Sequence, residues 1–410
     1  MKQNNTSAAL KRLSEAYIRL VLSVGGHDSD YVDAYYGPES LKGEQLPLEA
    51  IRKRASAAAA ELKTLSPTRM DETVRLRHRY ILRQLQSLIA RVDLLGGKKM
   101  TFDEESQALY DAVAPSYTEE HFKEILDELD AALPGRGDVP GRFEAYRKGF
   151  VIPGEKLDGV FTAAITESRK RTAGRITLPE GESFTVEYVT GKSWSGYNWF
   201  KGNCHSLIQV NTDLPITVDR AVDLASHEGY PGHHLYNSLL ETHLVRGRKW
   251  MEFTVYPLFS PQSLIAEGTA NFGIDMAFPG EERVEFEREV LFPLAGFPGA
   301  DAAEYYRIHG LFLRLAYAGN EAARRYLDGE FTREKAVEYL MSYALMSADR
   351  ALQRTKFFDQ YRTYVINYNL GQDMVKRFIE SAGGVPGKPD QRWKIFEALI
   401  SSPRLPSDLL

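Results

Sequence analysis

Residues 227–234 read His227-Glu228-Gly229-Tyr230-Pro231-Gly232-His233-His234, and this segment contains three of the nine histidines of the chain. Imidazole nitrogens and carboxylate oxygens are common metal ligands in proteins. Three histidines and a glutamate this close together are hard to bury with complete hydrogen bonding unless they surround an ion. The segment therefore predicts a metal site. The alternative is a polar helix break whose histidines are satisfied by other partners.

The spacing of these histidines differs from that of the usual helical zinc motif. In that motif the two histidines are four residues apart, and a glutamate directly after the first acts as general base. Here His233 and His234 follow His227 by six and seven residues, which would not converge on one ion along a regular helix. Pro231 and Gly232 break helical geometry between them. Looping out two residues restores the four-residue relation for His233 and looping out three restores it for His234, so we favour His233 and keep His234 as the alternative.

The histidine segment resembles the H-E-x-x-P-G-H-H-L-Q signature of the DUF885 family, and more distantly the motif of helical, Taq-type zinc carboxypeptidases. The resemblance implies Zn²⁺ bound by His227, His233 and a later glutamate, with Glu228 as the general base. It places Glu267, within Ile265–Phe272, on the metal; the alternative is a carboxylate that only favours a helix start. Asn271, one turn after Glu267, is expected to accept the outer N–H of a ligand histidine.

The resemblance is close at these two segments and loose elsewhere. Residues 31–38, Tyr-Val-Asp-Ala-Tyr-Tyr-Gly-Pro, are similar to an N-terminal stretch of the family, and we assign them no chemical role. Residues 368–372 resemble a Y-x-x-G-Q stretch near its C-terminus. The family usually has Gln two residues after the second adjacent histidine, where this chain has Tyr236. That departure leaves the expected ligands intact but puts any role of the glutamine in doubt.

Further candidates lie outside the metal segment. On the C-terminal helix Tyr368, with Tyr364 second, is a candidate hydroxyl donor to an oxyanion. Arg354 or Arg362 would hold a substrate carboxylate as a bidentate fork. The strand at 206–211, which includes Asn211, is expected to be an edge strand that pairs with the substrate backbone. For each of these, packing inside an ordinary helix or strand is the alternative.

Hydrophobic periodicity predicts a mainly α-helical, two-lobed, zincin-like fold. Residues 1–150 form a helical N-terminal lobe, and residues 151–410 form the catalytic region, with the active site in a cleft between lobes. Short β-favouring runs at 176–178, 184–189, 194–200 and 205–210 predict a small antiparallel sheet beside the metal helix. The expected helices span 8–24, 48–66, 69–95, 103–113, 118–132, 156–172, 233–246, 261–277, 302–318, 333–345 and 347–381, the last with a possible break at Gly371.

Composition limits the other classes of function. The formal net charge is −5 and no long run of like charge occurs, so neither nucleic acid nor a membrane surface is an expected partner. The single cysteine, Cys204, excludes an internal disulfide and suits a reducing compartment. Neither a signal peptide nor an apolar run of 18 residues is visible, which predicts a cytoplasmic protein. Removal of a leader and the oligomeric state stay open.

Together these features predict a zinc-dependent hydrolase acting on peptides. Glu228 would take a proton from a water molecule that zinc activates and pass it to the leaving amine. Two histidines and one carboxylate also suit a non-haem Fe(II) enzyme, although a glutamate next to the first ligand and the helical setting argue against it. A catalytically inactive binding protein of the same fold is the third possibility. The sequence does not determine peptide length, sequence preference or the end from which cleavage occurs.

Overall fold

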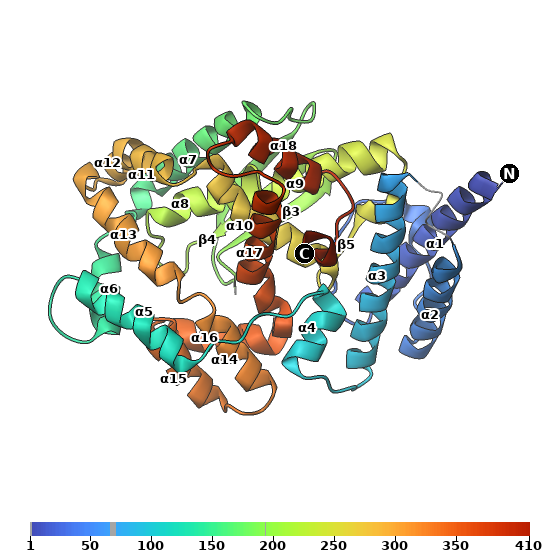
Figure 1. Cartoon of the computed structure of the whole chain (residues 1–410), viewed down its shortest axis with the longest axis horizontal. Coiled ribbons are helices and arrows are strands. Elements are labelled where there is room, and N and C mark those ends of the chain that lie inside the picture. The colour runs from blue at the N-terminus through green and yellow to red at the C-terminus, as the bar shows by residue number, and fades with distance from the viewer. Residues whose placement is uncertain (1, 66–70, 193) are drawn as a thin grey trace.

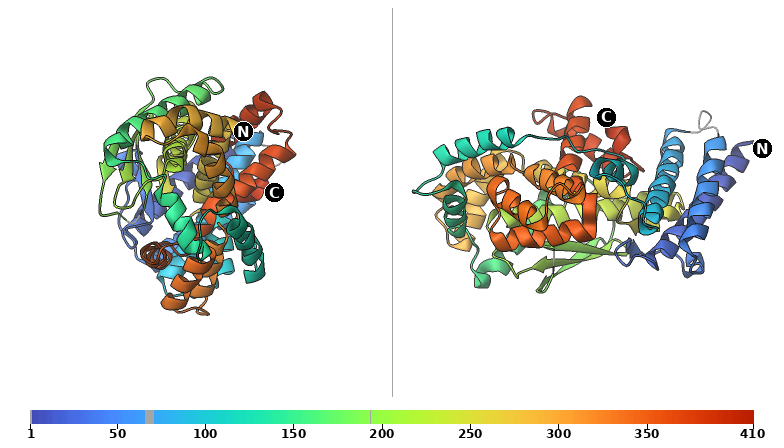
Figure 2. Two further views of the ribbon diagram at one scale, coloured as in Figure 1. Left: turned by 90° about the vertical axis from the view of Figure 1, so that its left-hand side faces the viewer. Right: turned by 90° about the horizontal axis from the view of Figure 1, so that it is seen from below.

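The computed structural model describes residues 2–65, 71–192 and 194–410 and is mainly helical, which confirms the predicted fold class (Figure 1). Three helices, α1 (Lys2–Gly25), α2 (Leu48–Thr64) and α3 (Glu72–Leu95), lie side by side at the N-terminal end of the elongated molecule (Figures 1 and 2). The Asp71 side chain accepts a hydrogen bond from the amide of Val74, which caps the start of α3. Residue 66 and residues 69–70, which we also expected in helices, lie outside the described residues.

Most of the other predicted helices are confirmed within a few residues. These are α4 (Phe102–Tyr110), α5 (Glu119–Ala132), α7 (Leu157–Ala173), α10 (Pro261–Ala277), α13 (Ala302–Leu313) and α15 (Arg333–Tyr343). Helices that the periodicity did not separate are α6 (Val139–Lys148), α11 (Glu281–Phe286), α12 (Phe292–Ala295), α14 (Ala318–Leu327) and α18 (Pro389–Ile400). Most of these are short, and short helices show too few turns for a clear apolar stripe.

A three-stranded sheet lies beside the centre of the molecule, and its pairing differs from the prediction. Its strands are β2 (Ser183–Val189), β3 (Gly196–Gly202) and β4 (His205–Asn211), in the spatial order β2-β4-β3. β3 and β4 are antiparallel, but β2 and β4 are parallel, so the wholly antiparallel sheet that we expected is wrong. The reason is that the hairpin returns β4 between β3 and β2 instead of on the outer side of β3. Residues 176–178 form no strand.

A second, two-stranded sheet was not predicted. It joins β1 (Val32–Tyr35), close to the N-terminus, to β5 (Val255–Pro257) in the antiparallel sense. Strands of four and three residues are too short to show alternation in the sequence. This pairing brings an N-terminal segment next to the elements that carry the candidate site.

Two helices, α10 and α17 (Ile366–Ser381), cross closely near the centre of the molecule (Figure 1). They meet at Gly268 and Gly371, where a β-carbon on Gly268 would lie 2.5 Å from the carbonyl carbon and oxygen of Gly371. The predicted helix break at Gly371 is therefore wrong, because this glycine lies inside α17 and permits the crossing. The break falls instead at Arg362, which has a φ of 50° and separates α16 (Ala348–Tyr361) from a 3₁₀ turn at Arg362–Val365.

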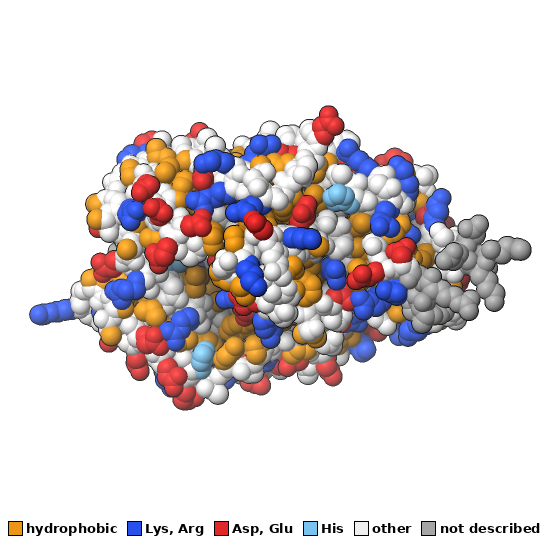
Figure 3. Space-filling view, turned by 45° about the horizontal axis from the view of Figure 1, so that its top comes forward, with side chains coloured by type: hydrophobic (Ala, Val, Ile, Leu, Met, Phe, Trp, Pro, Cys, Tyr) orange, Lys and Arg blue, Asp and Glu red, His pale blue; other side chains and the backbone are white. Residues whose placement is uncertain are grey.

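The main hydrophobic core joins residues from Leu10 to Leu409, and a second cluster lies around Phe150, Phe292 and Tyr305. The main core thus draws on both sides of residue 150, and the division of the chain there stays a prediction. Acidic and basic side chains are interspersed over the face seen in Figure 3. None of the helices within the described ranges is long and apolar enough to cross a membrane.

Candidate metal centre

The histidine segment folds as two helices joined by an abrupt break. Helix α8 (Asp219–Leu224) continues into one π-helical turn at Ala225–Gly229, Tyr230 is extended, and α9 (His233–Leu240) begins after Gly232. The amide of Gly232 donates to the carbonyl of Ser226 across the break, at 2.9 Å. A β-carbon on Gly232 would overlap the carbonyl oxygen of His227, so only glycine permits this close approach. The predicted helix break is confirmed, and it brings His233 back to the side of His227.

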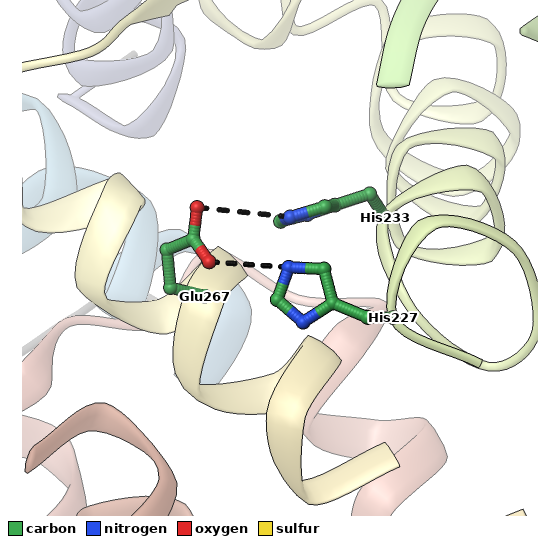
Figure 4. A group of neighbouring side chains, drawn as sticks. All are labelled: His227, His233 and Glu267. Carbon is green, nitrogen blue, oxygen red and sulfur yellow. Dashed lines mark ion pairs between the residues drawn. The ribbon is translucent and has the colours of Figure 1, made fainter. Parts of the chain in front are cut away.

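His227, His233 and Glu267 come together with their possible ligand atoms all within 4.8 Å of one another (Figure 4). His227 Nε2 lies 3.3 Å from Glu267 Oε2, and His233 Nε2 lies 3.7 Å from Glu267 Oε1. The two imidazole rings are nearly perpendicular, with centroids 4.6 Å apart. Two imidazoles from the two sides of the break and one carboxylate from α10 form a donor set that suits zinc.

The hydrogen bonds around His227 indicate that a cation belongs between these groups. Asn271 donates through Nδ2 to the carbonyl of Tyr368 at 3.2 Å, so its Oδ1 faces His227 Nδ1, 3.0 Å away. Nδ1 must then carry the proton, and in the neutral ring Nε2 presents a lone pair toward Glu267. Oε2 of Glu267 is buried and has no hydrogen-bond partner among the described residues. A metal ion there would bind the Nε2 lone pair and Oε2, and a protonated His227 ring is the alternative partner of that oxygen, at 3.3 Å.

The titration of the group in the metal-free protein agrees with an affinity for cations. Burial alone would lower the pKa of His227, but the carboxylates of Glu267 and Glu228 raise this pKa to about 9. The ring therefore carries a proton at neutral pH when no metal ion is bound. Burial lowers the pKa of His233 to about 4, which leaves this ring neutral. Burial opposes ionisation of Glu267, yet His227, His233 and Tyr364 hold its pKa below the usual value. Glu267 thus favours its anionic form and His233 its neutral form, which are the forms in which a carboxylate and an imidazole bind a metal ion.

Glu228 lies next to the first ligand with its side chain buried in the same cavity. Burial raises the pKa of this carboxyl to about 7, with His227 and Glu267 acting in opposite directions. Gly196 at the start of β3 makes room for the carboxylate, since a β-carbon there would lie 2.9 Å from Oε1. Asn198, also on β3, donates to the main-chain carbonyl of Glu228 at 2.8 Å and holds the π-helical turn. A buried carboxyl beside a metal site suits proton transfer near neutral pH.

His234 points away from this group into a separate buried network. Its Nε2 lies 2.9 Å from Glu182 Oε2 and its Nδ1 lies 2.9 Å from Ser206 Oγ. Glu182 also accepts from the hydroxyl of Tyr230 and from Arg169. Both ring nitrogens of His234 are thus occupied, and the structure groups His233, not His234, with the other candidate ligands.

The two candidate tyrosines, Tyr364 and Tyr368, differ in the hydrogen bonds that their hydroxyls make. The hydroxyl of Tyr364 donates to Glu267 Oε1 at 2.8 Å, so its proton is already committed to a candidate ligand. Tyr368 lines the cavity, and its hydroxyl has no hydrogen-bond partner in the described part of the chain. Burial, then the charge of Glu267, raises the pKa of Tyr368 well above its usual value, so the hydroxyl keeps its proton. The geometry favours Tyr368 as the donor to a substrate oxygen and Tyr364 as a support for Glu267.

Two of the three predicted substrate-binding residues have other partners. Arg362 does not line the cavity and binds the buried carboxylate of Glu105 at 2.7 Å, so it joins α4 to the turn after α16. Asn211 touches the cavity, but its amide donates to the carbonyls of Lys192 and Trp194 and holds that loop. The structure uses these polar groups within the fold, so it lends neither prediction support, and both stay predictions.

Arg354 remains a candidate for binding a substrate anion. It lines the cavity, packs over the ring of Phe357 with 4.5 Å to the centroid, and forms no ion pair within the described residues. Its Nε is buried and has no hydrogen-bond partner in the described part of the chain, and burial lowers the pKa of the guanidinium group.

The strand at 205–211 also occupies a position different from the one we expected. β4 is the central strand, with its backbone paired to β2 on one side and β3 on the other, so it has no free edge for a substrate. β3 takes the edge position, and its residues Gly196, Tyr197 and Asn198 line the cavity. A one-dimensional pattern shows that a strand exists but not which neighbour it acquires.

The cavity has a volume of about 660 Å³ and brings in residues that sequence reasoning missed. These include Asp33 from β1, Tyr197 from β3, Tyr256 from β5 and Tyr361 from α16. The only signal for Asp33 in the sequence was an isolated acidic residue within an aromatic segment, at 31–38. That segment was noted for its resemblance and given no chemical role.

Comparison with known proteins shows a shared fold but no family. No family model matches the chain, and no curated protein sequence matches it. Among solved structures, a "putative lipoprotein" from Colwellia psychrerythraea is 16% identical with a TM-score of 0.51, over 87% of this chain and 68% of that one. An M32 carboxypeptidase from Deinococcus radiodurans R1 is 14% identical with a TM-score of 0.40, over 100% and 94%. The first likeness shows a common fold, and the second is too weak to support an argument about function.

Proposed function

We propose that this chain is a zinc-dependent hydrolase that cleaves peptides. The observation that carries the proposal is the convergence of His227, His233 and Glu267, with an unsatisfied carboxylate oxygen between them, next to the buried Glu228. A zinc ion in such a site would polarise a carbonyl and make a water molecule acidic at neutral pH. The resemblance of the histidine segment to the DUF885 family agrees with this proposal.

Each residue of the site has a separate role in the proposed reaction. Glu228 accepts a proton from the attacking water and delivers it to the leaving amine, for which a pKa near neutrality is suitable. The hydroxyl of Tyr368 donates a hydrogen bond to the carbonyl oxygen, on which negative charge develops. Asn271 fixes the ring of His227, and Tyr364 fixes the carboxylate of Glu267. Arg354 holds a carboxylate of the substrate, and the free edge of β3 is the place for its backbone.

The decisive experiment compares the wild-type protein with Glu228→Gln after both are loaded with zinc. We expect elemental analysis to find one zinc per chain in both proteins, whereas digestion of a peptide library is seen only with the wild type. The rate of the variant should fall about 10²–10⁴-fold, the usual cost of removing a general base. Unchanged hydrolysis in Glu228→Gln would refute the role of Glu228 as general base. If the wild-type protein, once stripped of metal, regains activity with Fe(II) but not with zinc, the result would favour an iron enzyme.

A further inference from the structure

Asp33 is a carboxylate in the catalytic cavity that the proposed mechanism does not use. It lies on β1, lines the same cavity as Glu228 and Glu267, and accepts a hydrogen bond from the hydroxyl of Tyr197. Among the described residues, no lysine, arginine or histidine forms an ion pair with it. Burial, then the negative charges of Glu267 and Glu228, raises the pKa of Asp33 to about 7. A carboxylate kept for structure alone is normally paired with a cation or replaced by a neutral group.

Five aromatic or acidic residues from five different elements line the same cavity as Asp33. They are Tyr197 on β3, Tyr256 on β5, Tyr361 on α16, Glu228 in the π-helical turn and Glu267 on α10. Tyr197 is itself packed against Trp194 and Trp199, with ring centroids 5.4 and 4.5 Å away.

This combination has the chemistry of an ammonium site. A carboxylate provides the charge-assisted hydrogen bond, and tyrosine rings provide electron-rich faces that attract a cation. A carboxylate without a cationic partner in a partly dry cavity is costly until a cation arrives. Arg354, by contrast, lines the cavity without an ion pair to any residue that the structure describes, and it suits an anion.

The position of Asp33 then determines which ammonium group fits. Asp33 lines one cavity of about 660 Å³ together with Glu228 and Glu267. A sphere of that volume is about 11 Å across, the length of about three extended residues. A substrate ammonium bound at Asp33 is therefore one to three residues from the bond that is cut. In a peptide, the α-amine of the first residue is at that distance only when cleavage occurs close to the N-terminus.

On the basis of the proposed function, we infer that Asp33, with Tyr197, binds the free N-terminal amine of the substrate, so that the protein is an exopeptidase removing one to three residues from the N-terminus. The carboxylate touches the substrate without taking part in bond cleavage, and Tyr197 orients it. Blocking the amine of a peptide should therefore weaken binding before any chemistry occurs.

The test separates recognition from hydrolysis by using the zinc-loaded Glu228→Gln protein for binding. Calorimetry compares short alanine and leucine peptides with a free or an acetylated N-terminus, and we expect the free peptides to bind about 100-fold more tightly. In the Glu228→Gln background, Asp33→Asn should abolish this preference, whereas Asp30→Asn, which removes a nearby carboxylate outside the cavity lining, should keep it. Tyr197→Phe, which keeps the carboxylate but removes its hydrogen-bond donor, should reduce the preference about tenfold.

Hydrolysis is measured with the same peptides in the otherwise wild-type protein. Asp33→Asn should raise KM for free peptides about 100-fold with a small change in kcat, and should leave the rate on acetylated peptides within about threefold. Equal binding or equal cleavage of free and acetylated peptides would overturn the inference, as would an equal loss on both in Asp33→Asn. If free peptides are preferred in binding but no peptide is cleaved, the amine site stands and the proposed hydrolase activity fails.

Discussion

The crossing of α10 and α17 gives the most quantitative prediction, because it depends on the absence of two β-carbons. In Gly268→Ala, the new methyl group would lie 2.5 Å from the carbonyl carbon and oxygen of Gly371, about 1 Å inside ordinary contact distance. These neighbours are backbone atoms, so a side chain cannot rotate away to relieve the overlap. The two helices must separate, and Glu267 is the residue next to the substitution.

The magnitude follows from the dispersion energy that this separation of the helices removes. A gap of 0.5–1 Å forfeits a quarter to a half of the dispersion energy of each atom pair, and over some 20–30 pairs at ~0.1–0.2 kcal/mol this amounts to about 1–3 kcal/mol. Overpacking in cores usually costs a similar amount. Against this, replacing glycine by alanine within a helix favours folding by about 1 kcal/mol. The expected net loss in the free energy of unfolding is therefore up to about 2 kcal/mol.

Gly310→Ala is the matched control, because Gly310 is an exposed residue within α13 with no atom near the position of a β-carbon. It should gain about 0.5–1 kcal/mol. Urea unfolding of both variants, followed by circular dichroism after removal of metal with a chelator, gives the comparison. The free energies of unfolding of the two variants should differ by about 0.5–3 kcal/mol, and zinc affinity should fall only in Gly268→Ala. If Gly268→Ala is as stable as Gly310→Ala, the close crossing does not exist and the position assigned to Glu267 fails with it.

Other predictions concern the adjacent histidines and the buried carboxyl. His233→Ala should lose stoichiometric zinc with little change in the stability of the metal-free chain. His234→Ala should keep zinc, but its free energy of unfolding should fall by about 3 kcal/mol, because Glu182 stays buried with one partner fewer. The reverse result would exchange the roles of the two histidines. The raised pKa of Asp33 means that the folded state of the metal-free chain holds a proton which the unfolded state releases near pH 4. Stability should therefore decline by about 1–2 kcal/mol between pH 4 and about pH 7, after allowance for solvent screening, and Asp33→Asn should remove that part of the decline. Identical pH profiles of unfolding in the two proteins would contradict this assignment.

The sequence was most informative where a local rule was broken. Pro231 and Gly232 between two histidines required an interrupted helix, and the structure has that interruption, with His233 rather than His234 beside His227. This was predictable because side-chain direction along a short segment depends on backbone geometry within a few residues. The pairing of Asn271 with His227 was predicted on similar grounds, since residues one turn apart on a helix share a face.

Long-range partners were not predictable in this way. Arg362 had the chemistry of a carboxylate fork, but its partner is Glu105, more than 250 residues earlier in the chain. Asn211 holds a loop, β4 is a central strand, and Gly371 is a packing position instead of a helix break. In each case the residue type suggested an interaction, and the identity of the neighbour came only from packing.

The sequence by itself determined the helical class of the protein and the pair of histidines that face each other, because periodicity and helix breaking are local properties of the backbone. The tertiary structure alone decided that Glu267 and Asp33 share one cavity with that pair. Glu267 comes from the buried crossing of α10 and α17, and Asp33 comes from β1, which precedes His227 by more than 190 residues. Their meeting depends on which surfaces bury each other, and such packing leaves no periodic trace in the sequence.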